Sequence, residues 1–266
     1  MLSLIIEPSE LRENLNLEGL LIVDLSKREV FEKIHIPGAI HVEPREIISG
    51  TPPAPGKLPE LSRLETLFAR IGYRPDRHIV VYDDEGGGWA GRFIWTLDLL
   101  SHGKTSYLNG GIHAWIAANA PVTSETTEVE ASQVNLTISD QFSATIDEVL
   151  ASIGQDDVRI WDARSAAEHR GEQRFSARGG HIPGAINLDW LETMDRAASL
   201  RIRKDIQDVL NDLGLTTDKK IITHCQTHHR SGLTYLIGKS LGYDIKAYPG
   251  SWSEWGNHPD TPVETT

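Results

Sequence analysis

The sequence contains very little cysteine, little methionine and fewer basic than acidic residues. Of its 266 residues one is cysteine and two are methionine, and 26 Lys and Arg stand against 38 Asp and Glu, for a formal net charge of −12. A single cysteine cannot close a disulfide within the chain, so nothing in the composition requires an oxidising compartment. The excess negative charge repels nucleic acid and anionic membranes, which argues against both as partners.

Long hydrophobic runs are also absent. No apolar stretch approaches the roughly 20 residues that a membrane-spanning helix needs. The first residues, MLSLIIEPSELREN, carry no basic region before their short apolar stretch, and they predict a strand leading into a helix instead of a signal peptide. These absences favour a cytoplasmic protein with neither a membrane nor a nucleic-acid partner.

The chain contains an internal repeat. A short apolar segment that ends in Asp24 recurs before Asp162, and the sequence HIPGAI occurs at 35–40 and again at 181–186. Further matching pairs follow in the same order at nearly constant separation: 77–81 with 219–223, 110–115 with 250–255, and 121–122 with 262–263. We therefore predict a tandem duplication, with one domain at 1–124, a polar linker at 125–142 and a second domain at 143–266.

Each unit alternates helical patterns with short apolar runs. At the start of the second unit, Thr145 and Glu148 have the S/T-x-x-E spacing of a capping box, which predicts a helix start. The β-branched runs 79–81 and 221–223 are typical of strands buried on both faces. The prediction is an α/β fold of two tandem domains, each a doubly wound parallel sheet with helices on both faces. Such sheets bind ligands at the carboxyl ends of their strands.

The only cysteine, Cys225, follows one of these predicted strands. The loop from Cys225 to Arg230 leads directly into a helical pattern, whose free N–H groups and dipole favour a negative charge. A short loop can also turn several backbone N–H groups inward as an anion-binding nest, here formed by Gln226, Thr227, His228, His229 and Ser231. These features, together with the charge of Arg230, stabilise a thiolate. A lone cysteine is more often a small buried hydrophobe, but this placement favours a catalytic nucleophile.

A metal site is a competing interpretation of this loop. His224, Cys225, His228 and His229 can all ligate zinc, but structural zinc sites usually draw their ligands from two separated clusters. A loop whose backbone turns inward directs its side chains outward, so we expect the histidines to line the pocket mouth or to hydrogen-bond locally. We predict neither a metal nor a cofactor.

The first unit lacks the nucleophile. Asp83 occupies the position that corresponds to Cys225, and the acidic, glycine-rich residues after it match no phosphate-binding loop. We expect a non-catalytic domain that walls the active-site cleft. Trp89 could reach that interface, although a core position is the expectation for it, as it is for Trp252 and Trp255.

These elements together resemble the rhodanese family of sulfurtransferases. The resemblance rests on the C-x4-R-S loop at 225–231, on Asp162-Ala-Arg164, on 180–185 and on 250–255, and the duplication extends it over the whole chain. The chain resembles the tandem-domain thiosulfate sulfurtransferases, and its Cys-Gln-Thr-His-His-Arg loop resembles that of one bacterial subtype.

The resemblance implies a two-step reaction without a cofactor. Cys225 would take the outer sulfur of an anionic donor such as thiosulfate as a persulfide, then pass it to a thiophilic acceptor such as cyanide or a thiol. Arg230 and Arg164 would bind the donor, and the protein would act as a monomer. The sequence departs from better-known members in two places: its loop carries no Lys or Arg before the last position, and Glu168 stands where relatives often have arginine. Other arginines (Arg170, Arg174 and Arg178) compensate for this or belong to a salt-bridged surface loop.

Alternatives to thiosulfate sulfur transfer remain. The donor could be 3-mercaptopyruvate. A phosphatase or arsenate reductase of the same fold is less favoured, because such enzymes use C-x5-R and this loop has four residues between Cys225 and Arg230. A non-enzymatic rhodanese-like binding module would be expected to lack the cysteine, as the first unit does.

Overall fold

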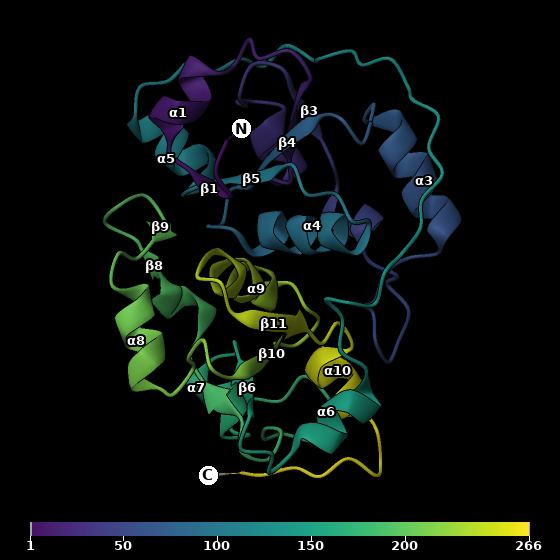
Figure 1. The fold of residues 1–266 in the computed structure, drawn as a ribbon, viewed down its shortest axis with the longest axis vertical. Helices are drawn as coiled ribbons and strands as arrows, with labels where there is room; N and C mark the ends of the chain where they lie inside the picture. The colour runs from purple at the N-terminus through teal and green to yellow at the C-terminus, as the bar shows by residue number, and fades with distance from the viewer. Residues whose placement is uncertain (1, 266) are drawn as a thin grey trace.

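The computed structural model describes residues 2–265 and shows two α/β units, each built on its own parallel sheet (Figure 1). In the first unit the strands are β1 (Ile5–Ile6), β2 (Leu20–Asp24), β3 (Ala39–His41), β4 (His78–Tyr82) and β5 (Thr105–Leu108). The helices are α1 (Pro8–Glu13), α2 (Arg28–Phe31), α3 (Leu61–Arg70), α4 (Gly88–Leu99) and α5 (Gly111–Ala117), with a 3₁₀ turn, η1, at Pro44–Ile47.

The second unit repeats this order. Its parallel strands are β6 (Val158–Asp162), β7 (Ile186–Asn187), β10 (Lys220–His224) and β11 (Asp244–Ala247). Its helices are α6 (Ile146–Ser152), α7 (Ala166–His169), α8 (Ile206–Asp212), α9 (Arg230–Ser240) and α10 (Ser251–Trp255), with a 3₁₀ turn, η2, at Trp190–Thr193. The sheet order β5-β4-β2-β3 of the first unit corresponds to β11-β10-β6-β7 of the second, which confirms the tandem fold. The first sheet adds β1 at its edge, where the second unit has only a single bridge from Ser143 to Ala247.

Both faces of the first sheet are covered. Along β4, Ile79 and Val81 pack into one hydrophobic cluster, whereas Val80 and Tyr82 pack into another on the opposite face. This alternation follows from the two-residue period of a strand, and it explains why the run is apolar throughout. In the second sheet, the neighbouring residues Ile221 and Ile222 likewise pack into two different hydrophobic clusters.

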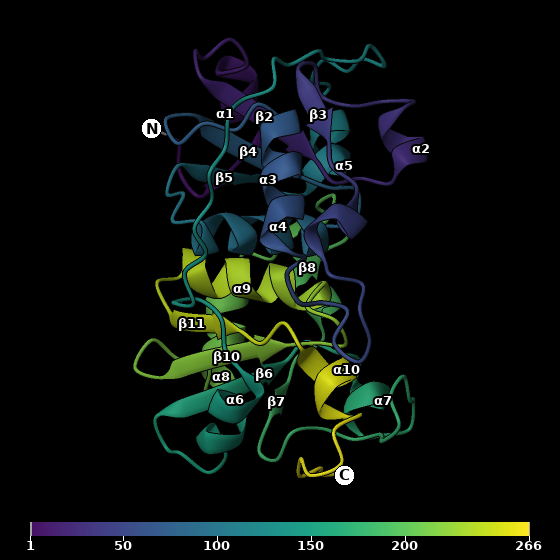
Figure 2. The same cartoon turned by 90° about the vertical axis from the view of Figure 1, so that its right-hand side faces the viewer.

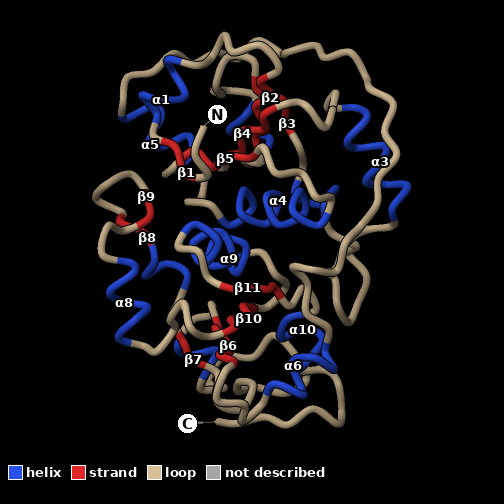
Figure 3. Tube along the Cα trace, in the orientation of Figure 1, coloured by secondary structure: helices blue, strands red, loops and turns tan. Residues whose placement is uncertain are grey.

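The capping box predicted at the start of the second unit is present. The backbone N–H of Glu148 donates to the Thr145 hydroxyl at 3.2 Å, and the N–H of Thr145 donates to the Glu148 carboxylate at 2.7 Å. The segment between α5 and α6 holds no helix or strand and runs along the outside of α3 (Figure 3). Two of its backbone N–H groups, from Ser132 and Leu136, bond to α3.

The two units meet where α4 crosses α9 (Figure 2). Glycines permit this contact: a Cβ on Gly91 would lie 2.2 Å from the carbonyl oxygen of Gly232, and a Cβ on Gly232 would lie 2.4 Å from that of Gly88. Because of this close approach, one hydrophobic cluster is continuous through both units.

A small hairpin that the sequence did not predict extends this interface. Strands β8 (Met194–Asp195) and β9 (Arg201–Ile202) pair antiparallel. Arg201 forms an ion pair with Glu7 at 2.8 Å, and the N–H of Ile202 donates to Asn109 at 2.9 Å. This hairpin therefore adds further contacts between the two units. No helix within residues 2–265 is long and apolar enough to cross a membrane.

Candidate active site

Cys225 lies at the carboxyl end of β10, which is flanked by β11 and β6 within the second sheet. The loop after it ends at His229, and α9 begins at Arg230. The side chain of Cys225 is completely buried. The backbone holds it in place, because its carbonyl accepts the N–H of Trp252 at 2.9 Å and its own N–H donates to Ser251 at 3.3 Å.

The surroundings of the sulfur favour its anionic form. Burial alone would raise the pKa of the Cys225 thiol, but the charges of Arg230 and His229 and hydrogen bonds from Ser231 together lower the pKa below its ordinary value. The Ser231 hydroxyl donates to Sγ at 3.5 Å, and the backbone N–H of Ser231 also points at the sulfur. This electrostatic balance suits a thiolate nucleophile.

The first unit shows what such a loop does for an anion. Asp83 follows β4 as Cys225 follows β10, and its carboxylate accepts four backbone N–H groups from the loop and the first turn of α4. The four donors are Glu85, Gly86, Gly87 and Ala90, at 2.9 to 3.1 Å. Burial nevertheless raises the pKa of Asp83 to about 6. The duplicated position thus holds an acidic side chain inside a nest of N–H groups.

Both loop histidines direct their side chains toward α4 of the first unit. His228 is buried, its Nδ1 lies 2.7 Å from the Ser231 hydroxyl, and its ring meets Trp95 edge-on with centroids 4.6 Å apart. His229 forms an ion pair with Glu85 and stacks on Trp89 at 4.3 Å. The expectation of a core position for Trp89 was wrong, because this side chain is half-buried at the domain interface. Trp252 and Trp255 are core residues, as expected.

The other loop residues make separate contacts. The amide of Gln226 donates to the Ser176 hydroxyl at 3.1 Å and to the carbonyl of Phe175 at 3.3 Å. Thr227 lies against the first unit, since a Cβ on Gly56 would come 2.0 Å from its carbonyl oxygen. The first unit therefore covers this part of the loop.

Arg230 is held by Glu168 of α7. Its two terminal nitrogens donate to the two carboxylate oxygens at 2.6 and 2.8 Å. Burial opposes ionisation of Glu168, but these bonds hold its pKa below the ordinary value. Guanidinium has five N–H donors, so three are not used by Glu168. The sequence signalled Glu168 through the capping-box spacing Ser165-x-x-Glu168, which the structure contains, but not its bond to Arg230.

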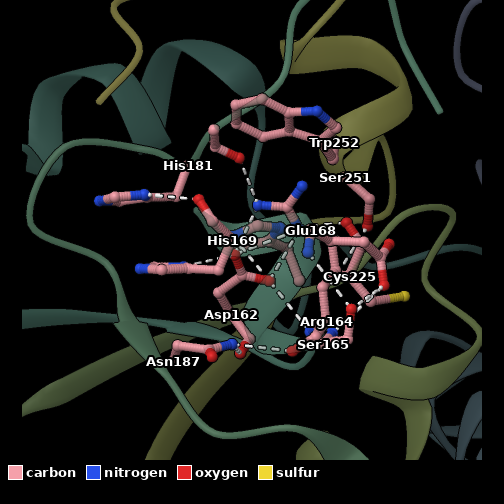
Figure 4. A network of polar contacts seen from close by, with 12 residues as sticks. Asp162, Arg164, Ser165, Glu168, His169, His181, Asn187, Cys225, Ser251 and Trp252 are labelled. Atoms are coloured by element: carbon pink, nitrogen blue, oxygen red, sulfur yellow. Dashed lines mark hydrogen bonds and ion pairs between the residues drawn. The ribbon is translucent and has the colours of Figure 1, made fainter. Parts of the chain in front are cut away.

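Arg164 is placed differently from the prediction that it binds the donor. Its side chain is 1% exposed, it bonds both carboxylate oxygens of Asp162 and the carbonyl of Gly180, and it lies over the Trp252 ring at 4.3 Å (Figure 4). Despite the cost of burial, neighbouring histidines and Arg164 hold the pKa of Asp162 well below its usual range. Arg164 thus joins the end of β6 to α10.

Two of the other arginines of this segment, Arg170 and Arg178, also have partners. Arg170 forms an ion pair with Glu172, and Arg178 donates to the carbonyls of Trp255 and Thr261. Arg170 is therefore salt-bridged at the surface, whereas Arg178 is held by backbone carbonyls.

The side chains considered as zinc ligands diverge. His224 is buried with Nε2 4.0 Å from Asp162, whereas His228 and His229 reach Ser231 and Glu85. Within residues 2–265 no group of three or more His, Cys, Asp or Glu is arranged to hold a metal ion.

Comparison with known proteins agrees with this architecture. The rhodanese-like domain family matches residues 7–118 and again residues 145–258, and the chain belongs to this family. It is 52% identical to the thiosulfate sulfurtransferase of Azotobacter vinelandii, over 99% of this chain and 97% of that protein. It is 30% identical to the 3-mercaptopyruvate sulfurtransferase of Escherichia coli K12, over 86% of this chain and 83% of that protein. The crystal structure of YnjE has the same fold, with a TM-score of 0.88 over 98% of this chain and 68% of that one, at 19% identity.

Proposed function

We propose that the protein is a thiosulfate sulfurtransferase that carries sulfur as a persulfide on Cys225. The observation that carries this proposal is the buried sulfur at a strand end, whose pKa is lowered although burial alone would raise it. The full-length similarity to a protein named thiosulfate sulfurtransferase supports thiosulfate as the donor.

The chemistry takes two displacements. The Cys225 thiolate attacks the outer sulfur of thiosulfate, the sulfur–sulfur bond breaks, and sulfite leaves with the electron pair. Cyanide or a thiol then attacks the terminal sulfur of the persulfide, and the Cys225 thiolate is released. In both steps a negative charge lies on the sulfur of Cys225 or on the sulfur bound to it. Fixed positive groups and N–H donors around Sγ therefore stabilise the thiolate and the persulfide alike.

Arg230 is the donor-binding residue in this proposal. It lies close enough to Cys225 for each charge to act on the other, and three of its N–H groups are not used by Glu168. Arg164, in contrast, is committed to Asp162 and Gly180, so we assign it to the support of the site. The backbone of residues 226–229 and Ser231 forms the remainder of the anion site.

The site is completed within one chain, since Glu85 and Trp89 of the first unit hold the loop of the second. This arrangement supports action as a monomer. A catalytic thiolate without a disulfide partner also agrees with a reducing, cytoplasmic location.

Incubation with thiosulfate should add the mass of one sulfur atom, and cyanide should remove it. Because the chain has one cysteine, the adduct can be assigned to Cys225 without ambiguity. The matched control is Cys225→Ser, which should neither gain the mass nor produce thiocyanate. Absence of the adduct in the native protein, or thiocyanate production by the variant, would refute the mechanism. Faster loading from 3-mercaptopyruvate than from thiosulfate would overturn the donor assignment alone.

A further inference from the structure

Three successive carbonyl groups of the active-site loop point to neighbouring segments. The carbonyls of Cys225 and Gln226 each accept an N–H group from the first turn of α10 at 2.9 Å. The carbonyl of Thr227 lies against a backbone of the first unit. A trans peptide holds its N–H opposite to its carbonyl, so the N–H groups of residues 226–228 face the inside of the loop.

The third of these carbonyls is held by packing alone. The oxygen of Thr227 accepts no hydrogen bond within residues 2–265, and Gly56 of the first unit lies on it. A Cβ on Gly56 would come 2.0 Å from this oxygen and 2.8 Å from the carbonyl oxygen of Pro249. A hydrogen of the glycine therefore points at both oxygens, and any larger residue would have to displace a backbone.

Gly56 belongs to a segment of the first unit that reaches over the second. We call this segment, residues 48–58 between η1 and α3, the first arm. The N–H of Ser49 donates to the carbonyl of Lys57 at 2.8 Å, which closes the arm on itself. The arm runs down beside α10 (Figure 2), where Lys57 forms an ion pair with Glu254, and the Tyr248 hydroxyl donates to the same carboxylate at 2.8 Å. The arm and the active-site loop are thus anchored on the same helix.

The second unit has a matching segment that lies over the first. This second arm, residues 194–205, follows η2 as the first arm follows η1. A Cβ on Gly110 would lie 2.4 Å from the carbonyl oxygen of Ser199 in the second arm. In the repeat Gly110 corresponds to Gly250, the neighbour of Pro249, on which the first arm lies. The two arms therefore make equivalent contacts, but only the first lies over a loop with a cysteine.

The backbone after Thr227 is in an unfavourable conformation. His228 has a φ of 54°, in the left-handed region that residues with a Cβ seldom adopt. Half a turn of the peptide between Thr227 and His228 would return φ to the ordinary negative range. The same rotation would put the Thr227 carbonyl inside the loop in place of the His228 N–H, and a carbonyl oxygen there would repel an anion. The loop therefore needs an outside contact that keeps this peptide from turning.

We propose that the first arm positions the active-site loop, with Gly56 holding the peptide after Thr227 so that the N–H of His228 faces the sulfur anion of Cys225. The polarised C–H of Gly56 attracts the carbonyl oxygen, and the lack of a Cβ allows the close approach. Gly56 is a positioning residue, because it contacts the loop backbone and not the sulfur. The proposal rests on Cys225 being the nucleophile, but a thiolate measurement needs no donor or turnover. Failure of the arm can therefore be distinguished from failure of the thiosulfate assignment.

Gly56→Ala tests the contact. The φ of Gly56 lies outside the left-handed region, so the added methyl group acts only through what it meets. The measured quantity is thiolate absorbance at 240 nm against pH, minus the same titration of Cys225→Ser, which removes the signal of tyrosinate. Gly56→Ala should contain roughly tenfold less thiolate at a pH below both pKa values, since a hydrogen bond to a charged group is lost. Arg230 and His229, whose charges also act on the sulfur, stay unchanged.

The matched control is Gly110→Ala, which places a methyl group against the second arm. Both variants should lose stability in urea, because each methyl group meets a backbone oxygen, at 2.0 Å for Gly56 and 2.4 Å for Gly110. Only Gly56→Ala should lose thiolate, and in its crystal structure the Thr227 carbonyl should point into the loop. A native titration in folded Gly56→Ala, an equal loss of thiolate in both variants, or an unturned peptide would each overturn the proposal.

A milder pair of variants decides the question if Gly56→Ala does not fold. Lys57→Met breaks the exposed ion pair that fixes the first arm to α10, and should leave about threefold less thiolate, within the range for such a pair. Lys220→Met breaks an exposed ion pair with Asp157 instead, and should leave the titration unchanged. Equal titrations in these two variants would overturn the positioning role of the arm.

Discussion

Variants of the ion pair between Arg230 and Glu168 should distinguish the contribution of Arg230 to stability from its proposed contribution to donor binding. The side chain of Arg230 is 19% exposed and that of Glu168 is 5% exposed, so loss of the arginine leaves an unpaired, buried carboxylate. We expect Arg230→Met to lower the free energy of unfolding by about 3 kcal/mol at neutral pH, the lower end of the range for a broken buried pair because Arg230 is partly solvated. Combining it with Glu168→Gln should recover most of that loss, because no charge is then stranded.

The sign of the pH dependence follows from Glu168. Its folded pKa lies below the ordinary value of 4.5, so the pair stabilises the protein above that pH and loses its effect as the pH falls through the lower folded value. The stability difference between the native protein and Arg230→Met should therefore shrink on acidification. Urea unfolding across this pH range measures it.

Activity then distinguishes the two roles of Arg230. If it binds the donor, the stable double variant should still show weakened use of thiosulfate, with a raised KM and little change in acceptor dependence. A double variant as unstable as the single one would refute the pairing argument. Native thiosulfate dependence in the double variant would refute the donor-binding role.

Two further variants probe the contact between the units. Burial alone would lower the pKa of His229, but Glu85 raises it above 6.5, so this pair contributes stability below that pH and loses it as the pH rises through the folded value. Glu85→Gln should be less stable than the native protein by about 1 kcal/mol near pH 6 and equal to it in alkaline solution, and a difference independent of pH would contradict this. Gly91→Ala should lower the free energy of unfolding in urea by about 3 kcal/mol, because its methyl group would meet the backbone of α9. The control Gly103→Ala, whose added methyl group would have no atom within 4 Å, should lower it by almost nothing. Similar losses in the two variants would contradict the close packing of α4 on α9.

The sequence was sufficient to predict the repeat, the parallel sheets and the position of Cys225. These features depend on local patterns: β-branched runs for buried strands, and a capping box at Thr145. When such patterns recur in the same order along the chain, the repeat can be recognised from the sequence alone. The family assignment rested on the same local motifs, and the family match over residues 7–118 and 145–258 agrees with it.

Electrostatic partners from distant segments were not predictable. From the sequence we predicted that Arg164 and Arg230 both bind the donor. In the structure Arg164 is bonded to Asp162, whereas Arg230 bonds Glu168 and still has unused N–H donors. Likewise Trp89 is an interface residue because α4 packs on α9, and no pattern within α4 reveals its partner.

By itself, the sequence determined where the proposed nucleophile lies and on which kind of loop, because strand ends, turns and helix starts are set by near neighbours. Only the tertiary structure decided what surrounds the sulfur. The approach of α4 to α9 through glycines brings Glu85 and Trp95 of the first unit to His229 and His228 of the second. Coulomb interactions and hydrogen bonds depend on distance in space and on burial, and both are fixed only when the two units pack together.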